Sequence, residues 1–142
     1  EKFSLINTFV FDVDGVLTDG TLLVMPNGLM ARRMNIKDGY ALQLAVKKGY
    51  RVIIISGGHS PEVMDRLNKL GVKEVYMQVT DKLSLLQELI GTAEENQQQC
   101  LYMGDDIPDY HVMQLVGLPT CPQDACPEIK GISKYISSLV RG

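Results

Sequence analysis

The sequence predicts an α/β protein, a three-layer αβα sandwich around a mainly parallel sheet. Short apolar runs rich in β-branched residues alternate with stretches whose apolar residues recur at helical spacing, and this alternation is typical of βα units. The first run, residues 8–11, lacks the polar alternation of a half-exposed strand, which indicates a strand covered on both faces. With 142 residues, 45% of them hydrophobic, the chain can build one core, so residues 1–142 are expected to form one domain.

The first half of the chain is expected to contain two strands, a small hairpin and a helix. Residues 8–11 form the first strand, and the Asn27-Gly28 pair favours the positive φ angles of a tight turn, which predicts a β-hairpin flap at about residues 20–35. Asp38 can cap a helix that ends near Gly49, because apolar residues at helical spacing lie between them. Residues 52–55 form the next buried strand.

The second half continues the alternation. Ser60 caps the second helix, with Pro61 in its first turn, and Asp81 caps the third. The polar segment 94–99 is expected to be a loop, and the proline-containing tail from residue 117 receives no helix or strand. The expected elements are, in order, a helix at 60–71, a strand at 75–77, a helix at 82–90, a strand at 101–103 and a helix at 110–116.

Composition excludes several classes of function. Fourteen basic residues against 17 acidic ones give a net charge of -3, and no basic stripe is present, so nucleic acid is not an expected partner. No apolar run exceeds five residues, far short of the roughly 20 that span a bilayer, so no membrane association is expected. No secretory segment opens the chain, which favours a cytoplasmic protein.

Two aspartates, Asp12 and Asp14, follow the first apolar strand directly. Buried parallel strands present functional groups at their carboxyl ends, so the pair marks a candidate site. A carboxylate at a buried strand end is costly unless it is paired or bound to a cation, and a metal ion is the simplest partner. A capped turn or a calcium loop is the alternative, but a calcium loop needs further ligands at fixed offsets, which this sequence lacks.

The segment Ser56-Gly57-Gly58 follows the second buried strand and precedes a helix. Its hydroxyl group and exposed glycine amides could hold a phosphate at the helix amino terminus. Lys82, at the start of the third helix, could neutralise a phosphate oxygen as a compact cation. Each signal is weak alone, because glycine and serine are common in turns and most lysines are solvated.

A second acidic cluster follows the strand at 101–103. Asp105, Asp106 and Asp109 place three carboxylates within five residues, which is unusual for simple solubility. Helix capping by one of them and solvation of the others is the alternative. Hard oxygen ligands beside a phosphate site indicate Mg²⁺ rather than zinc.

Taken together, these motifs resemble the haloacid dehalogenase superfamily, over essentially the whole chain. The resemblance implies a Rossmann-like three-layer αβα sandwich. Segments 12–20, 35–40 and 104–106 more narrowly resemble the phosphatases of 3-deoxy-D-manno-octulosonate 8-phosphate. The superfamily spacing rests on Asp12-x-Asp14-x-Val16, Ser56, Lys82 and Gly104-Asp105-x-x-x-Asp109.

The resemblance assigns a role to each motif. Asp12 is the nucleophile that forms an aspartyl-phosphate, and it needs no activating base because a carboxylate is already ionised at neutral pH. Asp14 protonates the leaving alcohol and later deprotonates water. Ser56, the Gly57 amide and Lys82 hold the phosphoryl group. Mg²⁺ binds Asp12, the Asp14 carbonyl and Asp105, while Asp109 and Asp106 orient the water molecules around the ion.

Two further residues are candidates for contact with the rest of the substrate. Arg66 lies one to two turns into the helix that follows Ser56-Gly57-Gly58, the segment named here the phosphate loop. The resemblance favours contact of Arg66 with a sugar-acid carboxylate over a role as a surface charge. His59 follows the same loop and could touch the substrate, although a histidine at a helix start is more often an ordinary polar contact.

The sequence leaves no room for a cap domain on either side of Ser56. An open site must then take its walls from neighbouring subunits, so a homo-oligomer is expected, and the resemblance implies a homotetramer with active sites at the subunit interfaces. The substrate implied is a small phosphorylated sugar acid, the eight-carbon octulosonate 8-phosphate.

Three alternatives stay open. A nine-carbon sugar-acid phosphatase would share the catalytic residues, but related nine-carbon enzymes tend to have an acidic residue where this chain has Gly58-His59. A non-catalytic module, such as the phosphatase-like domain of a sugar-acid cytidylyltransferase, would be expected to lose an aspartate or the lysine. A calcium-binding or signalling receiver module would have no use for Asp14 as an acid.

Overall fold

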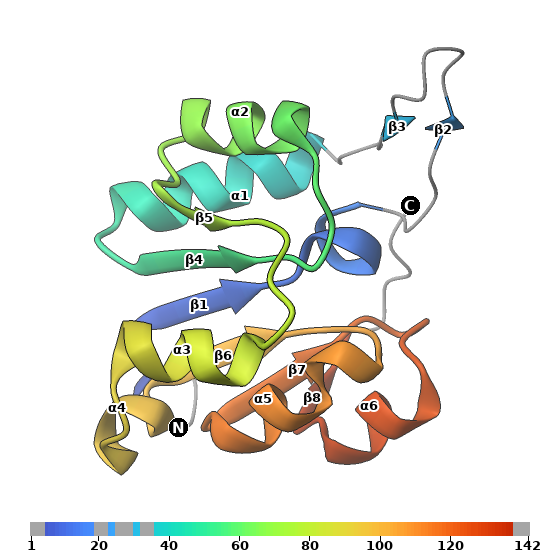
Figure 1. The fold of residues 1–142 in the computed structure, drawn as a ribbon. Coiled ribbons are helices and arrows are strands. Elements are labelled where there is room, and N and C mark those ends of the chain that lie inside the picture. The colour runs from blue at the N-terminus through green and yellow to red at the C-terminus, as the bar shows by residue number, and fades with distance from the viewer. Residues whose placement is uncertain (1–4, 19–22, 25–29, 32–35, 138–142) are drawn as a thin grey trace.

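Six parallel strands form the central sheet, in the order β5-β4-β1-β6-β7-β8 (Figure 1). The computed structural model describes residues 5–18, 23–24, 30–31 and 36–137. The prediction of an α/β protein with a mainly parallel sheet is therefore confirmed. The strands are β1 (Thr8–Phe11), β4 (Arg51–Ile55), β5 (Glu74–Tyr76), β6 (Cys100–Met103), β7 (Leu118–Cys121) and β8 (Tyr135–Ile136).

Helices cover both faces of this sheet and complete the three layers. Helices α1 and α2 pack on one face, and α3, α5 and α6 pack on the other (Figure 1). This arrangement explains why Val52–Ile55 of β4 and most of β1 and β6 are apolar on both faces. The helices are α1 (Ile36–Lys47), α2 (Pro61–Lys69), α3 (Lys82–Ile90), α4 (Glu94–Gln98), α5 (Tyr110–Leu115) and α6 (Pro127–Ile132).

Alternate residues of the strands contribute to two separate cores. Val10, Ile53 and Tyr102 belong to the cluster that includes α3, α5 and α6. Val52 and Ile54 belong to the cluster under α1 and α2. Because successive side chains of a strand point to opposite faces, the central strands β1, β4 and β6 supply apolar residues to both clusters.

The predicted helix caps at Ser60 and Asp81 are present. Ser60 Oγ accepts a hydrogen bond from the Val63 N–H at 3.4 Å, and Asp81 Oδ1 accepts one from the Ser84 N–H at 3.1 Å. These bonds satisfy backbone donors that a helix start leaves without partners. They also fix where α2 and α3 begin: α2 follows the loop that carries Ser56, and Lys82 is the first residue of α3.

Three predictions about secondary structure were wrong or incomplete. Helix α1 begins at Ile36, so Asp38 lies inside the helix rather than before it. Segment 94–99 is not simply a loop, because α4 forms there, with Glu94 and Glu95 in its first turn, where negative charge is favourable. The proline-containing tail, which received no element, forms β7, α6 and β8.

The hairpin flap is described only in part. Strands β2 (Leu23–Val24) and β3 (Met30–Ala31) pair in antiparallel fashion, as predicted for a hairpin. The predicted turn at Asn27-Gly28 and the rest of residues 20–35 lie outside the described residues. The extent of the domain, residues 1–142, stays a prediction.

No cap domain interrupts the described part of the fold. Between β4 and β6 the chain forms only α2, β5, α3 and α4, and between residues 18 and 36 the described residues form only β2 and β3. Among the described residues, no helix has the length and apolar character that crossing a bilayer requires.

The order of the strands creates one place for a site. From β1 the chain adds β4 and β5 on one side, and it then returns across β1 to add β6, β7 and β8 on the other. In parallel sheets of this kind, ligands bind outside the carboxyl ends of the strands at the point where the direction reverses. That point lies at the ends of β4, β1 and β6, after Ile55, Phe11 and Met103.

Candidate active site

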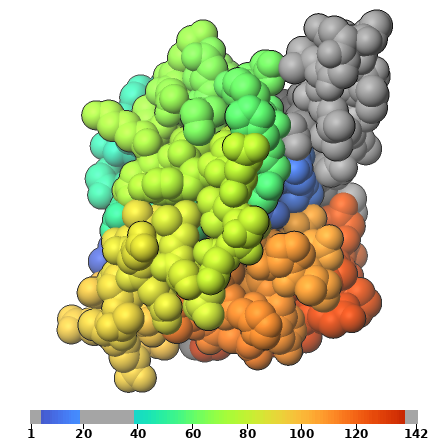
Figure 2. All heavy atoms as spheres, viewed as in Figure 1, coloured from blue at the N-terminus to red at the C-terminus, as the bar shows by residue number. Residues whose placement is uncertain are grey.

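A pocket of about 280 Å³ opens at the carboxyl ends of β4, β1 and β6. It brings together the phosphate loop, the first aspartate pair, Lys82 and the second acidic cluster, which are far apart in the sequence. In Figure 2 the segment after β1, in blue, lies between the green atoms around α2 and the orange atoms around α5. The pocket is lined by Asp12, Asp14, Gly15, Ser56, Gly57, Gly58, Lys82, Asp105, Asp106, Pro108 and Asp109.

The loop after β1 presents Asp12 and Asp14 to this pocket. The Asp12 N–H donates to the Met103 carbonyl at 3.1 Å, and its Oδ1 accepts from the Val13 N–H at 2.8 Å. The tight turn that follows needs glycine, because Gly15 has a φ of +82° and a Cβ atom there would overlap the Asp105 carboxylate. Gly15 therefore lets the two acidic segments approach each other.

Lys82 lies between two carboxylates at the bottom of the pocket. Its Nζ is 3.1 Å from Asp12 Oδ1 and 2.8 Å from Asp109 Oδ1. Lys82 is only 5% exposed, Asp12 8% and Asp109 0%. Burial alone would lower the pKa of Lys82, but the charges and hydrogen bonds of Asp109 and Asp12 outweigh it and raise this pKa. Lys82 is therefore a permanent cation beside Asp12.

Asp109 is held at both of its oxygens. Oδ1 also accepts a hydrogen bond from the Tyr102 hydroxyl at 2.7 Å, and Oδ2 accepts one from the Asp105 N–H at 3.3 Å. A Cβ at Gly104 would lie 2.6 Å from the Asp109 Cγ, so this packing also requires glycine. Sequence reasoning missed Tyr102, because a tyrosine in an apolar strand carries no signal beyond that of a core residue.

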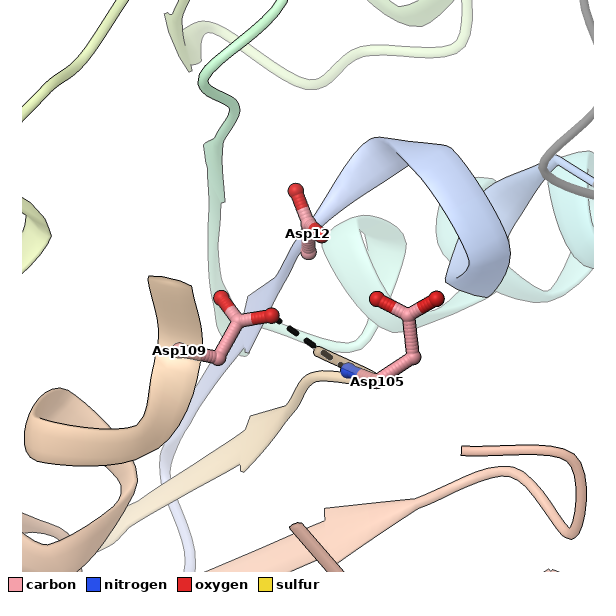
Figure 3. Close-up of side chains that lie close together, drawn as sticks. All are labelled: Asp12, Asp105 and Asp109. Atoms are coloured by element: carbon pink, nitrogen blue, oxygen red, sulfur yellow. Dashed lines mark hydrogen bonds between the residues drawn. The ribbon is translucent and has the colours of Figure 1, made fainter. Parts of the chain in front are cut away.

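Three carboxylates are arranged as ligands for a cation (Figure 3). One oxygen each of Asp12, Asp105 and Asp109 lies within 4.8 Å of the other two. Among the described residues no donor binds the Asp105 carboxylate, and the dashed line in Figure 3 joins only its backbone nitrogen to Asp109. A half-buried carboxylate without a donor, beside two others, fits a hard divalent cation.

The excess negative charge of Asp12, Asp105 and Asp109 also favours the binding of a divalent cation. Burial, and then the charge of Asp109, raise the pKa of Asp12 to about 6 in spite of Lys82. Burial, and then the charges of Asp12, Asp109 and Asp106, raise the pKa of Asp105 to about 8. One lysine therefore does not neutralise the cluster, and a bound cation would remove the remaining repulsion.

The phosphate loop is tied to the connection between β5 and α3. Ser56 is 2% exposed, and its Oγ accepts a hydrogen bond from the Gly58 N–H at 3.1 Å. The Ser56 carbonyl accepts from the Val79 N–H and the Gly58 carbonyl from the Gln78 N–H, both at 2.9 Å. The loop with Ser56 and the helix start with Lys82 are consequently fixed relative to each other.

The remaining predicted residues take different positions. Asp106 is exposed and lines the pocket. Its Oδ1 accepts a 2.8 Å hydrogen bond from the Ile107 N–H and so caps the short turn Ile107–Asp109. Helix capping, which was the alternative for one of the three aspartates, is therefore observed for Asp106. His59 and Arg66 are exposed and are not among the residues that line the pocket. A Cβ at Gly39 would lie 3.6 Å from Arg66 Nη2, which places this guanidinium beside the first turn of α1.

Without a bound cation, the free energy of unfolding is expected to fall as the pH rises from 5 to 8. Asp12 and Asp105 have pKa values of about 6 and about 8 in the folded state, above the ordinary 3.8. The folded state thus holds more protons in this window, and stability decreases as they are lost. Urea unfolding at several pH values, in chelator, measures this slope.

The control for this prediction is the variant Asp105→Asn, in which the slope should be shallower because one of the two groups no longer ionises. An added divalent cation should also stabilise the wild-type protein more at pH 8 than at pH 5. Metal-free stability that is flat or rises across this range would contradict the prediction.

Solved structures of the same fold identify the class of protein. A putative HAD superfamily (subfamily III A) hydrolase from Legionella pneumophila superimposes with a TM-score of 0.92 and 32% identity, over 99% of this chain and 78% of that one. The motifs around the pocket have the spacing of the same superfamily. The chain is a hydrolase of the haloacid dehalogenase superfamily.

Sequence relatives narrow the class further. The 3-deoxy-D-manno-octulosonate 8-phosphate phosphatase KdsC of Yersinia pestis is 33% identical over 142 residues, which is 100% of this chain and 76% of the relative. The chain belongs to this family of phosphoric monoester hydrolases. The corresponding phosphatase of Moraxella catarrhalis, solved with magnesium, phosphate and KDO, has a TM-score of 0.92 and 30% identity over 99% of this chain and 81% of that one. No protein-family model matches the chain.

Proposed function

We propose that this protein hydrolyses 3-deoxy-D-manno-octulosonate 8-phosphate in the presence of Mg²⁺, through an aspartyl-phosphate on Asp12. The observation that carries the proposal is a buried Asp12 with Lys82 at 3.1 Å and the Asp105 and Asp109 carboxylates beside it in one pocket. The names of the Yersinia and Moraxella relatives support the substrate.

The reaction has two steps at phosphorus. In the first, the Asp12 carboxylate attacks, the bond between phosphorus and the substrate alcohol oxygen breaks, and Asp14 gives that alcohol a proton. In the second, Asp14 takes a proton from water as the water attacks the acyl phosphate. Inorganic phosphate leaves, and Asp12 returns to its carboxylate form.

The chain's own donors hold the phosphoryl group during both steps. The Ser56 hydroxyl, the Gly57 amide and Lys82 all line the pocket and can face the phosphoryl oxygens. Their placement is set before the substrate binds, because the Ser56 loop and the Lys82 helix start are joined by backbone hydrogen bonds. Donors fixed in this way stabilise developing charge without reorganisation.

The acidic cluster is proposed to hold Mg²⁺. Asp12, the Asp14 carbonyl and Asp105 would bind the ion, and Asp109 and Asp106 would orient the water around it. The ion supplies positive charge that screens the anionic nucleophile from the anionic phosphate. Asp105 suits this role because no donor among the described residues occupies its carboxylate, whereas both oxygens of Asp109 already accept protein hydrogen bonds.

Recognition of the sugar acid is proposed to involve a second subunit. Arg66 would bind the carboxylate from beside the first turn of α1, and His59 would contact the substrate near the phosphate loop. The described residues include no cap domain over the pocket, so a homotetramer with active sites at subunit interfaces would supply the remaining walls. A cytoplasmic location and a single domain over residues 1–142 complete the proposal.

Phosphate release from a panel of substrates tests the proposal. The panel contains the eight-carbon and nine-carbon keto-sugar-acid phosphates and ordinary sugar phosphates, all with Mg²⁺. We expect kcat/KM to be highest for the octulosonate, by about tenfold or more, because sugar-acid contacts differ between the substrates. Equal or higher values for the nine-carbon acid would overturn the substrate, and no release from any compound would indicate a non-catalytic module.

A further inference from the structure

Tyr102 lies in the middle of the sheet, yet its hydroxyl reaches the active site. The residue is on β6, is 0% exposed and packs in the apolar cluster under α3 and α5. The hydroxyl donates to Asp109 Oδ1 at 2.7 Å. A buried hydroxyl needs a partner, but this partner is a carboxylate of the catalytic pocket rather than a backbone carbonyl.

The same oxygen also holds Lys82. Asp109 Oδ1 is 2.8 Å from Lys82 Nζ, and this Nζ is 3.1 Å from Asp12 Oδ1. A continuous chain of contacts thus runs from Tyr102 through Asp109 and Lys82 to Asp12. Lys82 is drawn to both carboxylates, so its position depends on how firmly Asp109 is held.

Three donors fix the Asp109 carboxylate, and Tyr102 is the one that comes from the core. The Asp105 N–H binds the other oxygen at a longer 3.3 Å, and Lys82 is itself shared with Asp12. Without the Tyr102 hydroxyl, the carboxylate loses its shortest contact and can turn about its side-chain bond. Lys82 would then follow it or shift toward Asp12.

We propose that Tyr102 is a positioning residue for phosphoryl transfer, which sets Lys82 beside Asp12 by fixing the Asp109 carboxylate. The inference rests on the proposed reaction at Asp12, but it does not depend on which sugar acid is the substrate. Burial, and then the charge and hydrogen bond of Asp109, raise the pKa of Tyr102 well above its ordinary value. The hydroxyl therefore remains a donor at every working pH.

The variant Tyr102→Phe tests this role, because it removes one oxygen and keeps the ring. Thr120→Val is the matched control. Thr120 is 1% exposed, and its hydroxyl donates to the Tyr102 carbonyl at 3.2 Å, so the control removes a buried hydrogen bond next to the same strand without touching Asp109. Both variants should lower the melting temperature to a similar extent, since each loses one buried hydrogen bond.

Two measurements separate positioning from a purely structural role. With para-nitrophenyl phosphate and Mg²⁺, Tyr102→Phe should lower kcat about tenfold and leave KM within about twofold, because the lost contact acts on the transition state. Binding of orthovanadate, which mimics the transferring phosphoryl group, should weaken about tenfold by calorimetry. In Thr120→Val, both kcat and the affinity for orthovanadate should stay within about twofold of the wild-type values.

Equal kcat and equal vanadate affinity in Tyr102→Phe and wild type would overturn the inference. Parallel losses in Tyr102→Phe and Thr120→Val would also overturn it, since general loosening of β6 would then be the cause. If only the substrate proposal is wrong, the wild-type protein will hydrolyse para-nitrophenyl phosphate but no sugar-acid phosphate. The comparison of the two variants would still decide the role of Tyr102.

Discussion

Replacing Asp12 by asparagine is expected to abolish phosphate release, with a fall in kcat of about 10⁶-fold, the order found when a covalent nucleophile is removed. The amide has nearly the shape of the carboxylate and can still accept the hydrogen bond from the Val13 N–H. It cannot form an acyl phosphate. The loss would therefore reflect chemistry rather than the position of the side chain.

The folded state of this variant should be at least as stable as wild type at pH 8. The pKa of Asp12 is raised to about 6 in the folded protein. Above that pH the ionised carboxylate destabilises the folded state relative to the unfolded state, and a neutral amide removes this destabilisation. Thermal unfolding measures the effect. Asp65→Asn is the control for the loss of one charge, because Asp65 is an exposed partner of Lys69 on α2. Near-normal turnover by Asp12→Asn would refute the assignment of the nucleophile.

Removal of divalent cations is expected to lower turnover by at least about 10²-fold, and added Mg²⁺ should restore it. In the proposed reaction Asp12 attacks an anionic phosphate while Asp105 and Asp109 lie close to it, and Lys82 supplies only one positive charge. Without the ion, burial and the charge of Asp109 raise the pKa of Asp12 to about 6, which also favours the protonated, non-nucleophilic form of this residue.

Phosphate release in chelator, followed by titration with MgCl₂, measures this dependence. NaCl at the same ionic strength is the control, because simple screening by salt would restore activity in both titrations. Rates that do not change in chelator would show that the reaction proceeds without a metal ion.

The parts of the fold that could be predicted from the sequence are those with one clear local signal. Strands β1, β4 and β6 are apolar on both faces, and Ser60 and Asp81 are typical caps. The tail has no such signal. Strand β7 is fully buried but contains Pro119, which cannot donate to a ladder and argues against a strand, and β8 has only two residues.

In the candidate site, too, some residues have a clear signal in the sequence and others do not. Asp12, Ser56 and Asp105 could be placed at one edge because the carboxyl ends of parallel strands meet there. The contacts among Lys82, Asp109 and Tyr102 could not, because they depend on how α3 packs against β6. Lys82 was predicted only to contact phosphate, whereas the structure places it between two carboxylates.

Backbone hydrogen bonds hold the loop Ser56-Gly57-Gly58 against the connection between β5 and α3. The Ser56 carbonyl is bonded to the Val79 N–H, and the Gly58 carbonyl to the Gln78 N–H. The loop with Ser56 is thus held by two backbone hydrogen bonds, whereas Arg66 and His59 are exposed and do not line the pocket. Under the roles proposed for these residues, substitutions at the surface would change which substrate is accepted, while the residues that line the pocket stay the same.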